Sequence, residues 1–225
     1  MFSACLAGFV SGLVLTGVQT FDVLPVLFEA EIYEQDAGPE PSMRTTTGRH
    51  PAADGHAAGD GHRLGWTAVA NVGFGIGLGL LLCAVYALRS PGTWAHGMLW
   101  GVGGYATFFL APAAGLPPEI PGTVTEALGA RQLWWLLAVT FTGVGLSLLF
   151  LGPGWIVKVL GLILIPIPHL MGAPHTGSYS GLAPEILADR FYAATLVVNA
   201  IFWLVLGTTS AFFFRRFTRQ AGSEG

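Results

Sequence analysis

Two histidines and a methionine lie within a proline-rich stretch, residues 165–175 (IPIPHLMGAPH), at the end of a long apolar run. His169, Met171 and His175 could coordinate a metal ion, because imidazole nitrogens and thioether sulfurs are both metal ligands in proteins. The three prolines lack a backbone N–H and interrupt a helix, so we expect a broken helix end here. A histidine at the end of a membrane helix needs a polar partner. That partner is either a metal ion or a carbonyl group that a proline leaves free.

A second set of candidate ligands lies in residues 50–62 (HPAADGHAAGDGH), where histidines recur every six residues. The set consists of His50, Asp54, His56, Asp60 and His62. Imidazole and carboxylate groups bind Co²⁺, Ni²⁺ and Zn²⁺ alike, and a flexible segment could wrap several of them around one ion. The competing interpretation is a solvated loop of low complexity in which the histidines have no role.

Acidic and polar residues near the end of the first apolar run form a third candidate site. Its members are Gln19, Asp22, Glu29, Glu31 and Glu34. Helical spacing brings the first three to nearly one face, and the last two follow if the helix continues. A carboxylate such as Asp22 is costly in a membrane helix unless it faces a cavity or a partner, so the stripe could form the outer lip of a cation pathway. Alternatively, Pro25 ends the helix, and Asp22 only caps it or forms a structural pair at the membrane surface.

The composition indicates an integral membrane protein in contact with the lipid bilayer. Of the 225 residues, 52% are hydrophobic and only 10% are charged, whereas about 25% of the residues in a soluble domain are charged. A net charge of −3 excludes the strongly basic character of nucleic-acid-binding proteins. The first apolar run has no basic residue before it, unlike a signal peptide, so we expect it to remain as a membrane helix.

Six apolar runs are visible, over residues 2–27, 66–88, 94–110, 133–151, 155–171 and 191–214. Because about 20 helical residues cross a bilayer core of about 30 Å, we expect an all-α polytopic bundle of about six transmembrane helices. The third and fifth runs are short, and five spans are the alternative. Glycines at 73, 75, 77 and 79 form overlapping GxxxG patterns, which predict a helix-packing face rather than a phosphate loop.

Two segments between the runs are expected to be non-helical. Residues 28–65 form one long polar loop within a single transmembrane domain of residues 1–225, and residues 35–61 have the composition of a disordered segment. Residues 111–122 (APAAGLPPEIPG) contain four prolines and two glycines. They predict an irregular segment that packs against protein at the membrane edge.

Six spans would place both termini on the same side of the membrane. The basic cluster RRFTR, residues 215–219, directly follows the last apolar run, and basic residues beside membrane helices favour the cytoplasmic side. We therefore expect cytoplasmic termini and a loop 28–65 that faces outside. Acidic residues that include Glu119, Glu126, Glu185 and Asp189 would also face outside. Such a face attracts cations.

The sequence contains no nucleophile elbow, HExxH motif or P-loop, so it predicts neither an enzyme nor ATP-driven transport by this chain alone. We expect no permanently bound cofactor. One alternative is a membrane redox subunit that binds haem or quinone, but haem needs axial ligands that face each other in the bilayer. His96 and His169 are the candidates, and the expected topology puts them at opposite ends. A membrane sensor or scaffold that binds metal without transporting it is a further alternative.

Several segments, in order along the chain, carry a resemblance to a bacterial family. They are EAEIYE (29–34), the histidine-bearing loop, LAPAAGLPPEIPG (110–122), ARQLWW (130–135), PHLMGAP (168–174) and NAIFWLVLG (199–207). With these segments the chain resembles the CbtA family of predicted cobalt transporter subunits. The resemblance implies uptake of Co²⁺ for cobalamin synthesis, five membrane spans and a location in the bacterial cytoplasmic membrane. It also implies a small single-span partner (CbtB-like) with a histidine-rich tail.

Together, the residues and the resemblance predict a membrane subunit of a Co²⁺ uptake transporter. The acidic, histidine-bearing outer loop would concentrate the ion. The ion would then pass Glu29, Glu31 and Glu34 toward an inner site near His169. The same ligand types suit Ni²⁺ and Zn²⁺ as transported ions.

Overall fold

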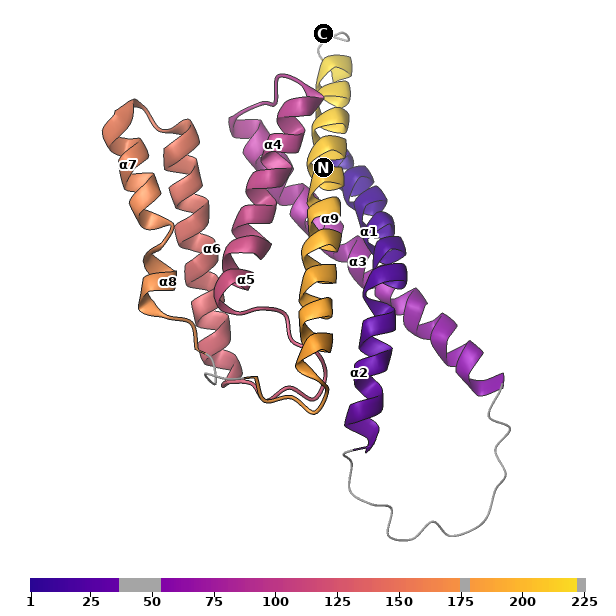
Figure 1. The fold of residues 1–225 in the computed structure, drawn as a ribbon. Helices are drawn as coiled ribbons and strands as arrows, with labels where there is room; N and C mark the ends of the chain where they lie inside the picture. Colours follow the sequence, from indigo (N-terminus) through magenta and orange to yellow (C-terminus); the bar gives the residue numbers. More distant parts are fainter. Residues whose placement is uncertain (37–53, 175–178, 222–225) are drawn as a thin grey trace, which may run out of the picture.

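The computed structural model describes residues 1–36, 54–174 and 179–221, and most of them are helical (Figure 1). The helices are α1 (Phe2–Asp22), α2 (Leu24–Asp36), α3 (Asp54–Leu88), α4 (Trp94–Tyr105), η1 (Ala106–Leu110), α5 (Ala111–Gly115), α6 (Leu128–Leu151), α7 (Gly154–Leu164), α8 (Ile167–Met171) and α9 (Glu185–Ala221). The element η1 is a π-helix. Within the described residues, extended pairing is limited to an isolated bridge. The predicted all-α fold is therefore confirmed.

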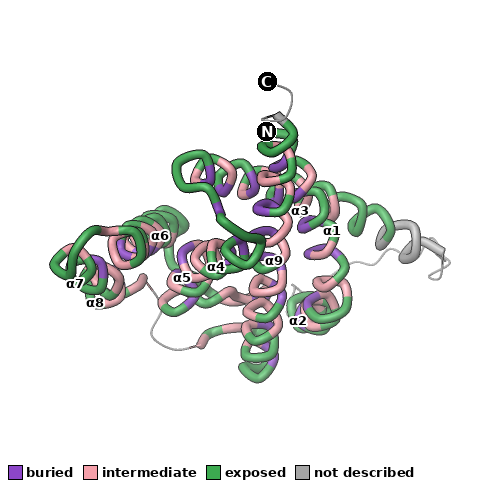
Figure 2. The backbone as a smooth tube through the Cα atoms, turned by 90° about the horizontal axis from the view of Figure 1, so that it is seen from above, coloured by how far each residue is buried: buried purple, intermediate pink, exposed green. Residues whose placement is uncertain are grey.

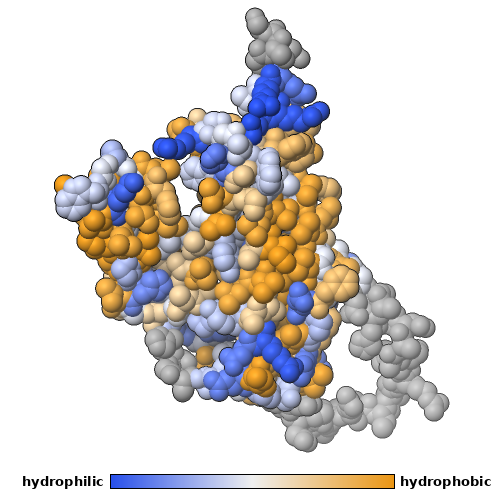
Figure 3. All heavy atoms as spheres, turned by 45° about the horizontal axis from the view of Figure 1, so that its top comes forward, coloured by the Kyte–Doolittle hydropathy of each residue, from blue (hydrophilic) through white to orange (hydrophobic). Residues whose placement is uncertain are grey.

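Five helical segments of the described chain are long and apolar enough to cross a membrane. They are Phe2–Asp22, Gly61–Leu88, Leu128–Leu151, Gly154–Met171 and Glu185–Gln220. The third predicted run corresponds to α4, η1 and α5, which follow one another without a gap from 94 to 115. The π-helix divides this run, so none of its helices alone has the length of a span. Apolar side chains cover the flank of the bundle (Figure 3), as expected for a surface in contact with lipid tails.

Both chain termini lie at the same end of the bundle (Figure 1). The ring of Phe2, at the start of α1, packs edge-to-face against Phe217 near the end of α9, with 5.8 Å between the ring centroids. We call this the terminal end, and the end that holds α2, α5 and the start of α9 the opposite end. The chain passes between the two ends through α1, α3, α4–α5, α6, α7–α8 and α9 in turn. An even number of passages is what brings the termini together.

Close contacts between glycines and neighbouring backbones hold four of the helices together. Gly8 of α1 lies against the backbone of Gly75 and Ile76 in α3, and Gly101 of α4 lies against Gly207 of α9. At each of these glycines a Cβ atom would overlap the neighbouring backbone. Of the four predicted packing glycines on α3, those at 75 and 79 contact α1, whereas those at 73 and 77 face open space. Small residues at such crossings allow the close approach on which membrane helices depend for their association.

Helices α6 and α7–α8 form a hairpin beside the other helices (Figure 2). Gly145 of α6 and Gly161 of α7 lie against each other's backbone, so these two helices also approach closely. The hairpin joins the rest of the bundle through α4, η1 and α5, where Thr107 of η1 packs against Gly143 of α6. Helix α5 is thereby placed beside the cavity described below.

The prediction of a polar loop over residues 28–65 is wrong at both of its ends. Helix α2 extends to Asp36 and α3 begins at Asp54, so residues 35–36 and 54–61 of the predicted disordered segment are helical as well. Residues 37–53 lie outside the described structure. Pro25 does not end the helical path, because it occupies the first turn of α2, where a missing N–H is tolerated. The EAEIYE sequence that follows has a favourable helix propensity despite its polarity.

The prediction of an irregular segment over residues 111–122 is wrong for its first five residues, which form α5. The π-helix η1 directly precedes α5, and the amide of Ala111 donates to the carbonyl oxygen of Ala106. Pro112 lies in the first turn of α5, where a missing N–H is tolerated. The amide of Leu116 still donates to the carbonyl oxygen of Pro112 at 2.8 Å. From 116 to 122 the backbone is irregular, as predicted.

Replacing Gly8 by alanine should lower the melting temperature of the purified protein in detergent. The added Cβ atom would overlap the backbone of α3, and overpacking of this kind costs about 1–3 kcal/mol. Gly17→Ala, in the same helix, is the matched control, because a Cβ atom there meets nothing within 4 Å. Alanine is also the better helix former by about 1 kcal/mol. Thermal unfolding followed by tryptophan fluorescence measures both variants, and equal melting temperatures would contradict a packing role for Gly8.

Candidate functional site

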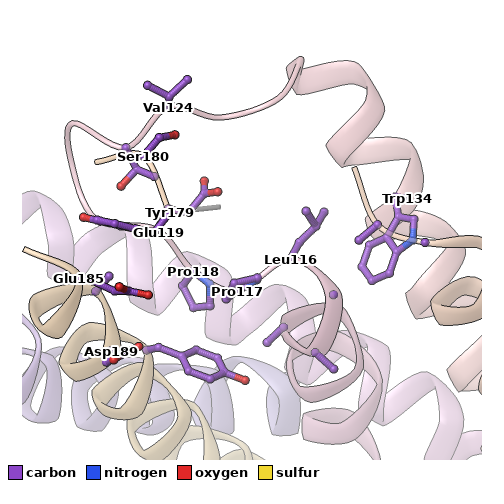
Figure 4. A pocket seen from close by; sticks show the side chains of 18 of the residues that line it. Leu116, Pro117, Pro118, Glu119, Val124, Trp134, Tyr179, Ser180, Glu185 and Asp189 are labelled. Carbon is purple, nitrogen blue, oxygen red and sulfur yellow. The ribbon is translucent and has the colours of Figure 1, made fainter. Parts of the chain in front are cut away.

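A cavity of about 670 Å³ lies at the opposite end of the bundle, between α5, α6, α8 and the first two turns of α9 (Figure 4). At about 30 Å³ per water molecule, this volume corresponds to roughly 20 waters. The polar side chains of its lining are Glu119, Thr123, His169, Tyr179, Ser180, Glu185, Asp189 and Tyr192. The cavity is therefore large enough to admit a cation together with its shell of water.

Two irregular segments, 116–124 and 179–182, form one wall of the cavity. Thr123 and Gly181 form the isolated bridge, and the amide of Val124 donates to the carbonyl oxygen of Ser180 at 2.9 Å. Gly122 has a φ of +76°, a conformation that glycine adopts at no steric cost. The prolines at 117, 118 and 121 have no amide that needs a partner. This backbone can therefore remain irregular at the membrane edge.

Trp134 of α6 positions His169 in the cavity lining. The indole Nε1–H of Trp134 donates to the carbonyl oxygen of Pro168 at 3.2 Å, and its ring packs edge-to-face on His169 with centroids 5.5 Å apart. Gly115 leaves the space that the Trp134 ring occupies. Gly172, with a φ of +85°, then ends α8. The broken helix end predicted from the prolines is confirmed, and it holds the imidazole at the cavity.

Three carboxylates give the cavity a negative charge. Glu185 and Asp189 come from the first two turns of α9, four residues apart and hence on one face (Figure 4). Glu119 is paired with Arg131, whose Nη2 lies 2.6 Å from the Glu119 Oε2. The three carboxylates outnumber the one arginine that is paired with one of them. The excess negative charge raises the local concentration of cations. The sequence identified these carboxylates only as part of an acidic face, because their spacing does not show that residues 119 and 185–189 meet.

The described residues do not form a preassembled metal centre. No three His, Cys, Asp or Glu side chains among them lie close enough to hold one ion. His169 and the carboxylates share one cavity but do not converge on one point. A structural metal is surrounded by a closed set of ligands, whereas this arrangement suits a cation that keeps its water and moves.

The comparison with family models relates the chain to a known family. Residues 1–215 match the CbtA model, which is described as a probable cobalt transporter subunit. The chain belongs to the CbtA family. The resemblance inferred from the sequence segments is thereby confirmed, and the chain is a multi-pass membrane protein of a cobalt transport family. No curated protein and no solved structure matches the chain in the other two comparisons.

The predicted acidic stripe of this CbtA-family chain lies outside the cavity. Glu31 forms an ion pair with Arg63 of α3 at 3.0 Å, and the Arg63 guanidinium also lies 5.3 Å from the centre of the Phe28 ring. The other acidic members, Asp22, Glu29 and Glu34, are exposed. No described residue of α2 or α3 lines the cavity. The bundle therefore carries two separate acidic features toward its opposite end.

The predicted histidine and sulfur ligands are dispersed. The His62 Nε2 accepts a hydrogen bond from the Trp66 Nε1–H at 3.0 Å, so a metal could bind this nitrogen only after that bond breaks. Asp54, His56 and Asp60 belong to the first turns of α3, whereas His50 and His175 lie outside the described residues. Met171 belongs to α8, but it is 68% exposed and does not line the cavity.

His96 lies far from His169. It belongs to the first turn of α4 at the terminal end, where its Nδ1 is 2.8 Å from the Thr93 hydroxyl oxygen. His169 lines the cavity at the opposite end, so these two histidines do not face each other as axial haem ligands must. Asn199, a predicted polar neighbour of His169, instead donates to the carbonyl oxygen of Thr195 in its own helix at 2.9 Å.

Replacing Trp134 by phenylalanine should loosen the attachment of α8. An aromatic ring would remain, but the hydrogen bond to the Pro168 carbonyl would be lost, which costs about 1 kcal/mol. We expect a lower melting temperature for the purified protein. Trp135→Phe is the matched control, because Trp135 is 41% exposed and makes no hydrogen bond through its side chain within the described residues. An equal loss of stability in the two variants would argue against a special role for Trp134.

Proposed function

We propose that this chain imports Co²⁺ across the bacterial cytoplasmic membrane and that the cavity is the outer vestibule of its pathway. One observation carries the proposal. In a member of a family of probable cobalt transporter subunits, carboxylates and His169 line a cavity large enough for a hydrated cation at one end of a membrane-spanning bundle. Negative charge gathers cations, and Co²⁺ accepts both imidazole and carboxylate ligands.

The two ends carry equal numbers of basic residues, because Arg44, Arg49, Arg63, Arg131 and Arg190 belong to the opposite side. The position of the basic cluster directly after α9, rather than the count, supports cytoplasmic termini. The terminal end carries Arg89, Lys158, Arg215, Arg216 and Arg219, in short connections or near helix ends. Basic residues in such places favour the cytoplasmic side, and the described acidic residues gather toward the opposite end. In this orientation the vestibule faces outside, where an imported ion arrives.

Capture, as we propose it, has two stages outside the membrane. The first stage is the collection of ions by the histidines and aspartates of residues 50–62, namely His50, Asp54, His56, Asp60 and His62. Negative potential is added by the carboxylates of the first two helices, namely Asp22, Glu29, Glu31 and Glu34. The ion then reaches His169 in the vestibule, with Met171 and His175 following on the same stretch of chain. Because histidine and carboxylate ligands must be deprotonated to bind, capture weakens as the pH falls.

Transport in this proposal depends on a second protein. The family is described as a transporter subunit, and we propose that the partner is a small single-span protein with a histidine-rich tail. The chain contains no P-loop, so nucleotide hydrolysis would have to be supplied by another protein. The same ligands accept Ni²⁺ and Zn²⁺, and competition by these ions is therefore part of the test.

Cells that lack their own cobalt importers should accumulate radioactive cobalt when they express this chain with the small partner. His169→Ala should lower the initial rate by roughly tenfold, the scale of effect of groups around a metal site. Leu170→Ala is the matched control, because Leu170 is 82% exposed and lies outside the cavity lining. The variant with His50, His56 and His62 all replaced by alanine should lower uptake only at low cobalt, since a capture segment matters when the ion is scarce.

Equal accumulation with and without the chain would contradict a transport role and would favour a sensor or scaffold that only binds metal. Immunoblots of membrane fractions distinguish lost transport from lost protein in each variant. Excess unlabelled Ni²⁺ and Zn²⁺ measure selectivity in the same assay. A Soret band in the absorption spectrum of the purified protein would support the redox alternative instead.

The double variant Glu185→Gln/Asp189→Asn should raise the Co²⁺ concentration for half-maximal uptake by roughly fivefold at low ionic strength, because two vestibule charges are lost. The difference should shrink with added salt, since the screening length falls from about 30 Å at 0.01 M to about 10 Å at 0.1 M. Glu29→Gln/Glu34→Gln removes the same charge outside the cavity and should have the smaller effect. A larger effect of this second variant would move the mouth of the pathway from the cavity to α2.

A further inference from the structure

A second cavity, of about 440 Å³, lies at the terminal end between the start of α4 and the end of α9. We call it the terminal groove. Its lining consists of Trp94, Phe212, Arg215, Arg216, Arg219 and Gln220. The groove is at the other end of the bundle from the vestibule, and ion capture as proposed above makes no use of it.

The terminal groove follows from the way α4 and α9 cross. Gly97 lies so close to Gly207 and Ala211 that a Cβ atom would overlap both, so the helices touch just before their ends. Trp94 precedes Gly97 by three residues, and Arg215 follows Ala211 by four. The larger side chains of Trp94 and Arg215 therefore line opposite sides of the groove, one helical turn beyond the contact at Gly97. By the same helical spacing, Arg219 lies on the same face of α9 as Arg215.

The three arginines of the groove have no carboxylate partner in the described part of the chain. The ion pairs found there are Arg63–Glu31 and Arg131–Glu119, and the described acidic residues lie toward the opposite end. Glu224, the acidic residue nearest in sequence, lies outside the described residues. The Thr93 hydroxyl accepts from the amide of His96, and the start of α4 adds the partial positive charge of a helix N-terminus. Three guanidinium groups in this setting attract an anion.

The lining of the terminal groove combines arginines with the apolar side chains of Trp94 and Phe212, so the groove lies where the apolar flank of the bundle meets its charged end. Trp94 is 57% exposed and Phe212 is 52% exposed, and aromatic side chains gather at the level of the lipid headgroups. An anion bound here has hydrocarbon on one side and water on the other. This setting suits the phosphodiester of a phospholipid, whose acyl chains continue along the apolar flank.

We propose that the terminal groove binds the phosphate of an anionic phospholipid headgroup, with Arg215 and Arg219 as its main ligands. Guanidinium groups bind phosphate oxygens through paired N–H···O bonds, which an ammonium group does not reproduce. Phe212 and Trp94 contact the adjoining apolar part of the lipid. Inorganic phosphate has the same anionic chemistry but lacks that part, so the groove prefers the lipid. The proposal does not depend on which ion the chain transports.

Native mass spectrometry of the purified full-length chain, titrated with phosphatidylglycerol, measures this binding. Arg215→Gln/Arg219→Gln should weaken it roughly thirtyfold, since each basic residue near a lipid surface contributes about fivefold. Arg89→Gln/Lys158→Gln removes the same charge from the same end outside the groove, and should weaken binding by no more than about twofold. Arg215→Lys/Arg219→Lys keeps the charge and should give an intermediate affinity, because only the paired hydrogen bonds are lost.

Three results would overturn the proposal. They are equal affinity for phosphatidylcholine with the same acyl chains, equal weakening by the groove and control pairs, and wild-type affinity of the lysine pair. Displacement of the lipid by millimolar inorganic phosphate would assign the groove to a soluble anion and would overturn the lipid assignment. If the glutamine pair does not fold, Trp94→Leu keeps every charge and removes only the aromatic wall. It should weaken phosphatidylglycerol binding, and unchanged affinity in that variant would also contradict the proposal.

Discussion

The packing of Trp134 at the junction of α5, α6 and α8 is the contact on which the cavity end of the bundle depends. Its ring fills the space beside Gly115, and its N–H satisfies a carbonyl group in a helix end broken by prolines. Irregular backbone at membrane depth is tolerated only where protein or water satisfies its polar groups. Because Trp134 provides such a partner, α8 can end beside the cavity and present His169 to it.

The two ends of the bundle differ in charge, and this difference gives the molecule a direction. Carboxylates gather around the cavity, whereas arginines without a carboxylate partner among the described residues gather where α9 ends. Basic residues beside membrane helices favour the cytoplasmic side, and carboxylates in a hollow concentrate cations. Orientation, ion capture and lipid binding, as proposed, therefore all follow from one separation of charge along the helix axes.

The sequence predicted the helices correctly where a segment is apolar throughout. The residues at which helices begin and end were harder to predict. An apolar run in a membrane must satisfy its own backbone, which makes it a helix. Residues 29–34 are polar but have a favourable helix propensity, so polarity alone misassigned them to a loop. At 111–115 the proline content predicted an irregular segment, but Pro112 occupies the first turn of α5, where proline is tolerated. The break before His169 was predictable, because proline acts locally.

The sequence by itself determined the membrane class, the all-α fold, the broken helix end and the likeness to the CbtA family. Each of these depends on composition, local spacing or the order of short segments. Only the tertiary structure decided that Glu119, Glu185 and Asp189 share a cavity with His169, because helix packing brings together residues that are far apart in the chain. It also left the acidic residues of α2 outside that cavity and Met171 outside its lining. The physical reason is that the buried face of a helix is set by its neighbours, and in a helix that is apolar on all sides the sequence does not mark that face.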